Sequence, residues 1–221
     1  EEEKLKTKGV FHGIIEIGQG IFKMPKVMLQ LAMVQFFTWL ALFSMWIYTT
    51  SSVAQNAFGT TDTTDKLFQD AGDWVGVMFT VYNGISAIVA FMLPVLAKKI
   101  GKSYTHMLCL IIGGIGLISL FFIHDKTTLL IPMLGVGLAW ASTLTMPYSI
   151  LANALPANKM GFYMGVFNFF IVIPQIVAAA LLGFCIKLFF HNESIYALVI
   201  GGISMIVAGL LCVFVKKEKI N

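Results

Sequence analysis

Long apolar runs without any charged residue dominate this chain. Six such windows contain no Asp, Glu, Lys or Arg: 27–61, 74–97, 103–123, 127–158, 160–186 and 194–215. A helix needs roughly 20 apolar residues to cross a hydrocarbon layer about 30 Å thick. We therefore predict six transmembrane helices, at about 27–50, 74–97, 104–123, 128–152, 162–188 and 194–215.

The composition supports a chain surrounded by lipid. Of the 221 residues, 58% are hydrophobic and 12% are charged, whereas a soluble domain is about half apolar and about a quarter charged. So few charges leave too little polar surface to cover a soluble globule. The predicted fold class is an all-α membrane protein, with a six-helix bundle over residues 27–221.

The positions of the lysines predict the orientation in the membrane. All 15 basic residues are lysine, and 12 of them fall on one side of the predicted alternating path. Only Lys66, Lys126 and Lys187 fall on the other side. Lysines in short loops stay cytoplasmic, so both termini are expected inside. The basic excess therefore reflects topology and does not indicate nucleic-acid binding. Lys without Arg, together with abundant Ile, hints at an AT-rich bacterial genome, so we expect a multi-pass plasma (bacterial inner) membrane protein.

Residues 1–26 form a charged lead-in to the first span. Apolar residues between Val10 and Phe22 recur at helical spacing, which predicts either an amphipathic helix at the membrane surface or an ordinary connector. The chain begins with Glu1 rather than Met. We therefore expect it to be a piece of a longer protein.

Uncharged polar and aromatic residues occur at mid-depth in four of the six predicted spans. The candidate substrate-binding residues are Gln35, Trp39, Asn83, Trp140, Tyr148, Asn168 and Gln175. An unpaired amide in hydrocarbon costs several kcal/mol, so these groups are expected to face one another or a water-filled cavity. The alternative is polar contact between helices, which contributes typically about 0.6 kcal/mol each.

The chemistry of this set favours a neutral ligand rich in hydroxyl groups. Amides both donate hydrogen bonds to hydroxyls and accept them, and aromatic faces stack on C–H surfaces. No carboxylate lies in any predicted span. A cation-coupled carrier usually needs an intramembrane acid, so any such group is expected outside this chain. His106 is the only histidine well inside a span and is a weak candidate for protonation.

Four segments carry a resemblance to a known family. "GVFNFFIVIPQI" (165–176) resembles the signature of the sucrose-transporter-like (glycoside/cation symporter) branch of the major facilitator superfamily. "TMPYSILANALP" (145–156), "WLALF" (39–43) and "VYNGI" (81–85) are similar to its other second-half helices, in the same order.

The resemblance implies the second six-helix half of a twelve-helix carrier, with residues 1–26 as the central cytoplasmic linker. Its expected partners are a missing N-terminal half, a lipid bilayer and a sugar such as sucrose or maltose. Transport is expected to proceed by alternating access between the two halves, with substrate at mid-membrane. The coupling ion is expected to be H⁺, with no other cofactor and no metal. Pro174 is expected to free a backbone carbonyl and soften its helix.

Two departures from the family pattern weaken parts of this expectation. Thr49, Thr50 and Ser51 stand where plant members carry acidic residues, which puts a coupling role there in doubt. In "LAKKIGK", Lys98 stands where the facilitator loop motif would place an acid. This argues against an acidic charge relay in that loop.

The sequence leaves two other kinds of function to consider beside a carrier. A self-sufficient six-helix channel or membrane scaffold, working as an oligomer, is the alternative to a carrier. A membrane-embedded enzyme is poorly supported, because the spans hold no His/Asp cluster, no Ser–His pair at workable spacing and no metal-ligand spacing. We therefore expect no enzymatic activity.

Overall fold

The protein is an all-helical bundle whose described helices are long enough to cross a membrane. A computed structural model describes residues 24–155 and 160–215. Within these ranges there is no strand, and six helices have the length and apolarity of membrane spans. This confirms the predicted fold class. The amphipathic helix predicted within residues 1–26 lies almost wholly outside the described residues.

The six spans agree with the predicted bounds to within two residues at each end in four cases, and in the other two cases they are clearly longer than predicted. Their bounds are α2 Lys26–Ala57, α3 Lys66–Ile100, α4 Lys102–Ser119, α5 Leu130–Leu151, α6 Met160–Val177, α7 Gly183–Phe189 and α8 Ile195–Leu211. Short 3₁₀ turns extend α4 over Leu120–Phe122 and α8 over Cys212–Phe214, and a π-helical turn, Ala178–Leu182, joins α6 to α7 as one span. The largest difference is α3, which begins eight residues before the predicted Trp74.

The start of α3 shows why it extends beyond the apolar window. Asp65 is its N-cap, and one carboxylate oxygen accepts a hydrogen bond from the backbone N–H of Leu67 at 3.0 Å. Its other oxygen accepts from the Thr60 hydroxyl at 3.0 Å. A capped N-terminus is stable in water, so the helix begins before the membrane does.

A sharp turn at Gly101 separates α3 from α4. Gly101 has a φ of 92°, a backbone conformation that residues other than glycine rarely adopt. The ammonium group of Lys102, the next residue, donates to the backbone carbonyl of Ser149 at 2.8 Å. A cation on the carboxyl-terminal carbonyls of α5 is favourable. Lys102, at the start of α4, thus binds the carboxyl-terminal end of α5, at the predicted inner end of the bundle.

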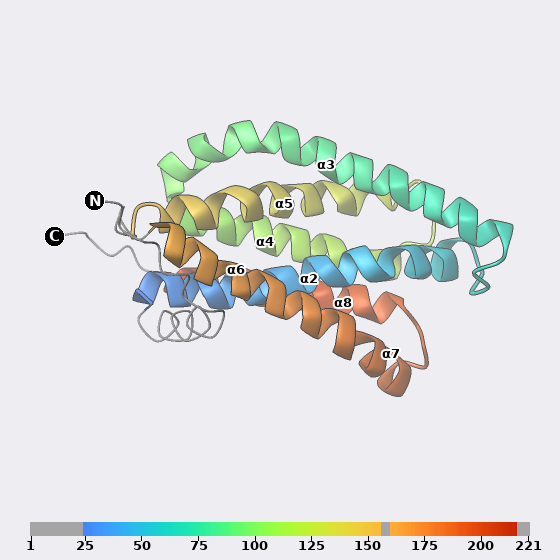
Figure 1. The fold of residues 1–221 in the computed structure, drawn as a ribbon. Coiled ribbons are helices and arrows are strands. Elements are labelled where there is room, and N and C mark those ends of the chain that lie inside the picture. Colours follow the sequence, from blue (N-terminus) through green and yellow to red (C-terminus); the bar gives the residue numbers. More distant parts are fainter. Residues whose placement is uncertain (1–23, 156–159, 216–221) are drawn as a thin grey trace, which may run out of the picture.

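Four helices form the packed centre of the bundle. Figure 1 shows α2, α4, α5 and α8 at the middle, with α3 along one side and α6–α7 along the other. Glycines allow the close approach of α4 and α8: a Cβ added at Gly114 would lie 2.6 Å from the Gly202 carbonyl oxygen, and one at Gly202 would lie 2.7 Å from the Gly114 oxygen. Such small-residue contacts are how membrane helices pack tightly.

The helices α3 and α6–α7 are much less covered than the others. Only 17% of the apolar window of α3 and 22% of that of α6–α7 is buried, against 50–56% for the other four spans. Gly76 and Gly84 on α3 and Gly161 and Gly165 on α6 have nothing within 4 Å of an added Cβ. These two helices therefore carry open faces that nothing in the described residues covers.

Candidate functional site

Aromatic side chains from three helices meet near the middle of the bundle. Trp39 and Trp46 of α2 lie against Trp140 of α5, with ring centroids 6.1 Å and 5.5 Å away. The indole N–H of Trp46 donates a hydrogen bond to the Tyr82 hydroxyl of α3 at 3.1 Å. We call Trp39, Trp46, Tyr82 and Trp140 the aromatic cluster. It joins α2, α3 and α5, which are three of the four helices expected to line a pathway.

The fourth of these helices, α6, contacts α5 about two turns nearer the predicted inner end than Trp140 does. The ring of Tyr148 on α5 packs edge-on against Phe167 of α6, with centroids 6.2 Å apart. Phe167 is fully buried and Tyr148 is half-buried. Tyr148 has no hydrogen-bond partner among the described residues. The hydroxyl is therefore available to a ligand or water.

Next to the aromatic cluster, α2 holds buried polar atoms with no partner. Neither the amide oxygen nor the amide nitrogen of Gln35 makes a hydrogen bond within the described part of the chain, and the indole N–H of Trp39 makes none either. Gln35 is 0% exposed and Trp39 is 9% exposed. Because the residues are four apart, both point from one face of the helix. Buried polar atoms in a native structure usually have partners, so the missing partners mark this face of α2 as a candidate binding surface.

The hydroxyl groups of α2 contrast with Gln35. Thr38, Ser44 and Thr49 each donate to the carbonyl four residues earlier, at 2.8 Å, 2.6 Å and 2.6 Å. Such bonds satisfy a hydroxyl inside its own helix. Thr38, which the sequence places in the same polar stripe as Gln35 and Trp39, is therefore engaged locally.

The three other predicted amides lie on the two open helices. Asn83 is exposed, and its side-chain nitrogen donates to the Phe79 carbonyl at 2.8 Å. Asn168 is exposed and Gln175 is half-buried. Within the described ranges no hydrogen bond joins any of these amides to the aromatic cluster. The structure thus brings Trp39 and Trp140 together, and leaves Asn83, Asn168 and Gln175 on helices whose faces the described residues do not cover.

Three residues that complete these contacts are not among the candidate binding residues. Trp46 follows Trp39 by seven residues, and helical spacing places it in one stripe with Gln35 and Trp39. Tyr82 lies beside Asn83 in the sequence, where only the amide is a candidate. For Phe167 the sequence offers no signal, because apolar residues surround it on both sides.

The proline of α6 does not interrupt its helix. Pro174 is buried inside α6, which continues to Val177 before the π-helical turn. A proline at this position removes one hydrogen bond of the helix, and π turns often occur at functional sites. The irregular stretch therefore begins just beyond Gln175.

His106 makes a separate contact between α4 and α5. Its Nδ1 lies 2.8 Å from the hydroxyl oxygen of Ser142, and its Nε2 is buried without a partner among the described residues. The pair lies toward the predicted inner end of both helices. A proton on Nε2 would be unsatisfied there, and a proton on Nδ1 would be donated to Ser142.

The described residues hold no group of three or more His, Cys, Asp or Glu side chains placed to bind a metal. Cys109 and Cys212 are buried and Cys185 is half-buried, and all three are free thiols. The chemistry available near mid-depth is thus hydrogen bonding and aromatic contact without formal charge.

Comparison with known families gives one match. The family model described as Major Facilitator Superfamily matches residues 1–179. A search of curated proteins returned no match.

Proposed function

Because this chain belongs to the major facilitator superfamily, and is therefore part of a multi-pass membrane transporter, we propose that it carries a neutral sugar. The proposed substrates are disaccharides such as sucrose or maltose. The sequence features that favour this branch of the superfamily are the Ile-Pro-Gln segment ending at Gln175 and the three segments that resemble its neighbours.

The observation that carries the proposal is the buried, unpartnered amide of Gln35, one turn along α2 from Trp39, whose ring lies against that of Trp140. An amide both donates and accepts hydrogen bonds, as sugar hydroxyls do. Flat aromatic faces suit the C–H surface of a pyranose ring. No side chain in this group carries a charge, so an ionic substrate would find no counter-charge here.

The open faces of α3 and α6–α7 support a second proposal, that a further six-helix half completes the carrier. Facilitator transporters place substrate between two such halves that rock against each other. A partner half would cover the unfilled positions around Gly84 and Gly165. It would also enclose Asn83, Asn168 and Gln175 between the halves. Residues 1–26 are proposed as the linker from that half.

Coupling to protons is proposed to rely on groups outside the spans of this chain. Among the described membrane helices, only α3 contains acidic residues: Asp70 and Asp73, near its predicted outer end and before the apolar window that begins at Trp74. Since cation coupling usually needs an intramembrane acid, the partner half is the proposed location. By the lysine distribution, both termini are proposed to lie in the cytoplasm of a bacterial cell.

An uptake assay on the intact protein in proteoliposomes tests this function. A panel of labelled disaccharides is offered with and without an inward proton gradient. We expect uptake of at least one disaccharide, accelerated by the gradient, and strongly reduced uptake in Gln175→Leu at normal protein levels. Normal transport of every glycoside by a folded Gln175→Leu carrier would contradict the assigned site.

The open faces also fit a second copy of the chain, which is the arrangement that a six-helix oligomeric channel would need. The mass of the purified, detergent-solubilised natural gene product distinguishes the two. A single chain with twelve spans supports the carrier. An assembly of identical six-helix chains supports the oligomer.

A further inference from the structure

A polar cavity lies at the predicted outer end of the bundle, where Ser51 and Gln55 follow Trp46 of the aromatic cluster along α2. Its volume is about 360 Å³, and three separate segments line it: the last turns of α2, the connection into α3, and the connection from α7 to α8. Ligand pockets in proteins typically measure about 300–1,000 Å³. The cavity is therefore large enough for a small solute.

Most polar side chains lining this cavity have no hydrogen-bond partner among the described residues. The oxygen of Gln55 accepts a hydrogen bond from the backbone N–H of Ser194 at 3.2 Å, which ties α2 to the start of α8. The amide nitrogen of Gln55 is left with no partner among the described residues. The same holds for the hydroxyls of Ser51, Thr61 and Thr63, which also line the cavity.

The cavity lining carries no carboxylate and no lysine. Of the nearby acids, Asp62 accepts from the backbone N–H and the hydroxyl of Thr64, and Asp65 caps α3. Glu193, between Asn192 and Ser194, is exposed and does not line the cavity. His191 is the one titratable side chain in the lining, and Phe68 adds an aromatic ring. Hydroxyls, amides and one ring without fixed charge select for a neutral solute.

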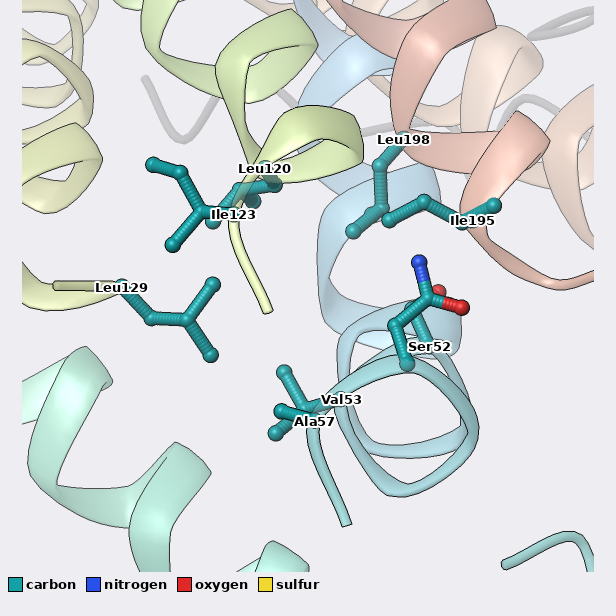
Figure 2. Close-up of a pocket in the computed structure, with 9 residues that line it drawn as sticks. Ser52, Val53, Ala57, Leu120, Ile123, Leu129, Ile195 and Leu198 are labelled. Atoms are coloured by element: carbon teal, nitrogen blue, oxygen red, sulfur yellow. The ribbon is translucent and has the colours of Figure 1, made fainter. Parts of the chain in front are cut away.

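The opposite side of the same α2 turns shows that this polarity is not general at this end. Figure 2 shows Ser52, Val53 and Ala57 facing Leu129 and Leu198 around a small apolar cavity of about 10 Å³. The Ser52 hydroxyl there is satisfied by the Tyr48 carbonyl at 2.7 Å. Asn56 also lines the small cavity, and its amide makes no hydrogen bond among the described residues. The free hydroxyl groups, in contrast, lie on the Ser51 and Gln55 side.

We propose that this outer cavity, lined by Ser51, Gln55, Thr61, Thr63 and Phe68, is a second binding site for a neutral, hydroxyl-rich solute. It holds the solute at the predicted outer mouth, before the solute reaches mid-membrane. The solute class matches that of the proposed function, but the residues are different. The two proposals can therefore fail separately.

Cysteine protection on the intact protein in sealed, right-side-out vesicles tests the site. The native cysteines are replaced by Ser, Thr63→Cys is introduced, and Gln35→Leu disables the mid-membrane site. Thr63 is exposed and its hydroxyl is unbonded, so the substitution is expected to leave the fold intact. The matched control is Thr127→Cys, an exposed threonine of the α4–α5 connection that does not line the cavity.

The reagent is a membrane-impermeant maleimide, and the probes are sucrose and maltose. At about ten times the apparent Kd, we expect labelling at position 63 to slow roughly tenfold, because only the unoccupied fraction reacts. Labelling at position 127 is expected to be unchanged. Protection at 63 without any sugar uptake by the parent protein would support this site and contradict the proposed transport.

Three results would overturn the inference. The first is no protection by either sugar at position 63. The second is equal protection by betaine at the same osmolality, which would indicate a general solvent effect. The third is protection that disappears with Gln35→Leu, which would mean that sugar acts at the mid-membrane site and changes position 63 only indirectly.

Discussion

The glycines of α4 and α8 and those of α3 and α6 lie in opposite surroundings. At Gly114 and Gly202, an added Cβ would lie 2.6 Å and 2.7 Å from the backbone carbonyl oxygen of the facing glycine. At Gly84 and Gly165 an added Cβ meets nothing within 4 Å. Glycine thus allows two helices to pack closely in one region and lies on an open helix face in the other.

Buried hydroxyl groups differ between the two regions in the same direction as the glycines. In the packed region they are engaged: the Ser204 hydroxyl of α8 donates to the Phe37 carbonyl of α2 at 2.8 Å, and the Ser142 hydroxyl contacts His106. The Gln35 amide is the contrasting group there, because it is buried without a partner among the described residues. On the open helices, Asn168 and Gln175 have no partner in the described part of the chain. The hydroxyl contacts and the glycine contacts thus separate a closed helix interface from faces that the described residues leave open.

The sharpest way to break this comparison is a matched pair of alanine substitutions. Gly114→Ala forces α4 and α8 apart, so we expect a loss of about 1–3 kcal/mol or more in stability. Gly84→Ala enters open space and improves helix propensity by up to about 1 kcal/mol. Thermal unfolding of the purified protein, followed by loss of helical signal, measures both. Equal destabilisation by the two changes would contradict the distinction between the regions.

Gln35→Leu tests whether an unpartnered buried amide is kept for binding. Removing two unsatisfied polar atoms relieves a desolvation cost of about 1–3 kcal/mol, so the variant is expected to be more stable than the parent. Sugar transport is expected to fall at least tenfold. Thr38→Val is the control, because Thr38 lies about one turn from Gln35 on α2 and its hydroxyl bonds only to its own helix. This variant should transport normally. A Gln35→Leu protein that is less stable would show that the amide has a structural partner.

Tyr82→Phe tests the link between α2 and α3. Loss of the hydrogen bond from Trp46 is expected to cost about 1 kcal/mol. Trp46→Phe should cost a similar hydrogen-bond contribution in addition to lost ring area, and the double variant should cost less than the sum. A double-mutant cycle on unfolding free energies measures the coupling. Strict additivity would mean that the two groups do not interact.

The smallest expected effect is a pH dependence at the turn before α5. The hydroxyl and backbone N–H of Thr128 both donate to Asp125 at 2.8 Å, which lowers the pKa of that carboxyl below its ordinary value of 3.8. A lowered pKa means that the stabilisation is present above the ordinary pKa and is lost as pH falls through the lowered one. Hydrogen exchange of the Thr128 amide should accelerate relative to Leu151 only below about pH 4. Acceleration beginning near neutral pH would contradict the assignment.

The fold was largely predictable because charge-free windows of about 20 residues have few other structural solutions. The ends of the helices were less predictable, because a cap such as Asp65 depends on a local turn in water and not on hydropathy. In the site, Trp39 and Trp140 were predicted and do meet. The contact of Trp46 with Tyr82 and the burial of Phe167 depend on how the helices rotate against each other, and this rotation is set by glycine contacts such as Gly114 with Gly202.

We propose that the mid-depth amides turn toward a shared, water-filled space. Cysteine accessibility measures this directly, in a protein whose native cysteines are replaced by Ser. Asn83→Cys and Gln175→Cys should react with a membrane-impermeant maleimide, and a transported disaccharide should slow both reactions. Ile115→Cys and Ile203→Cys, on the exposed apolar faces of α4 and α8, should not react. Unreactive cysteines at positions 83 and 175, or reactivity equal to that at 115 and 203, would contradict the claim.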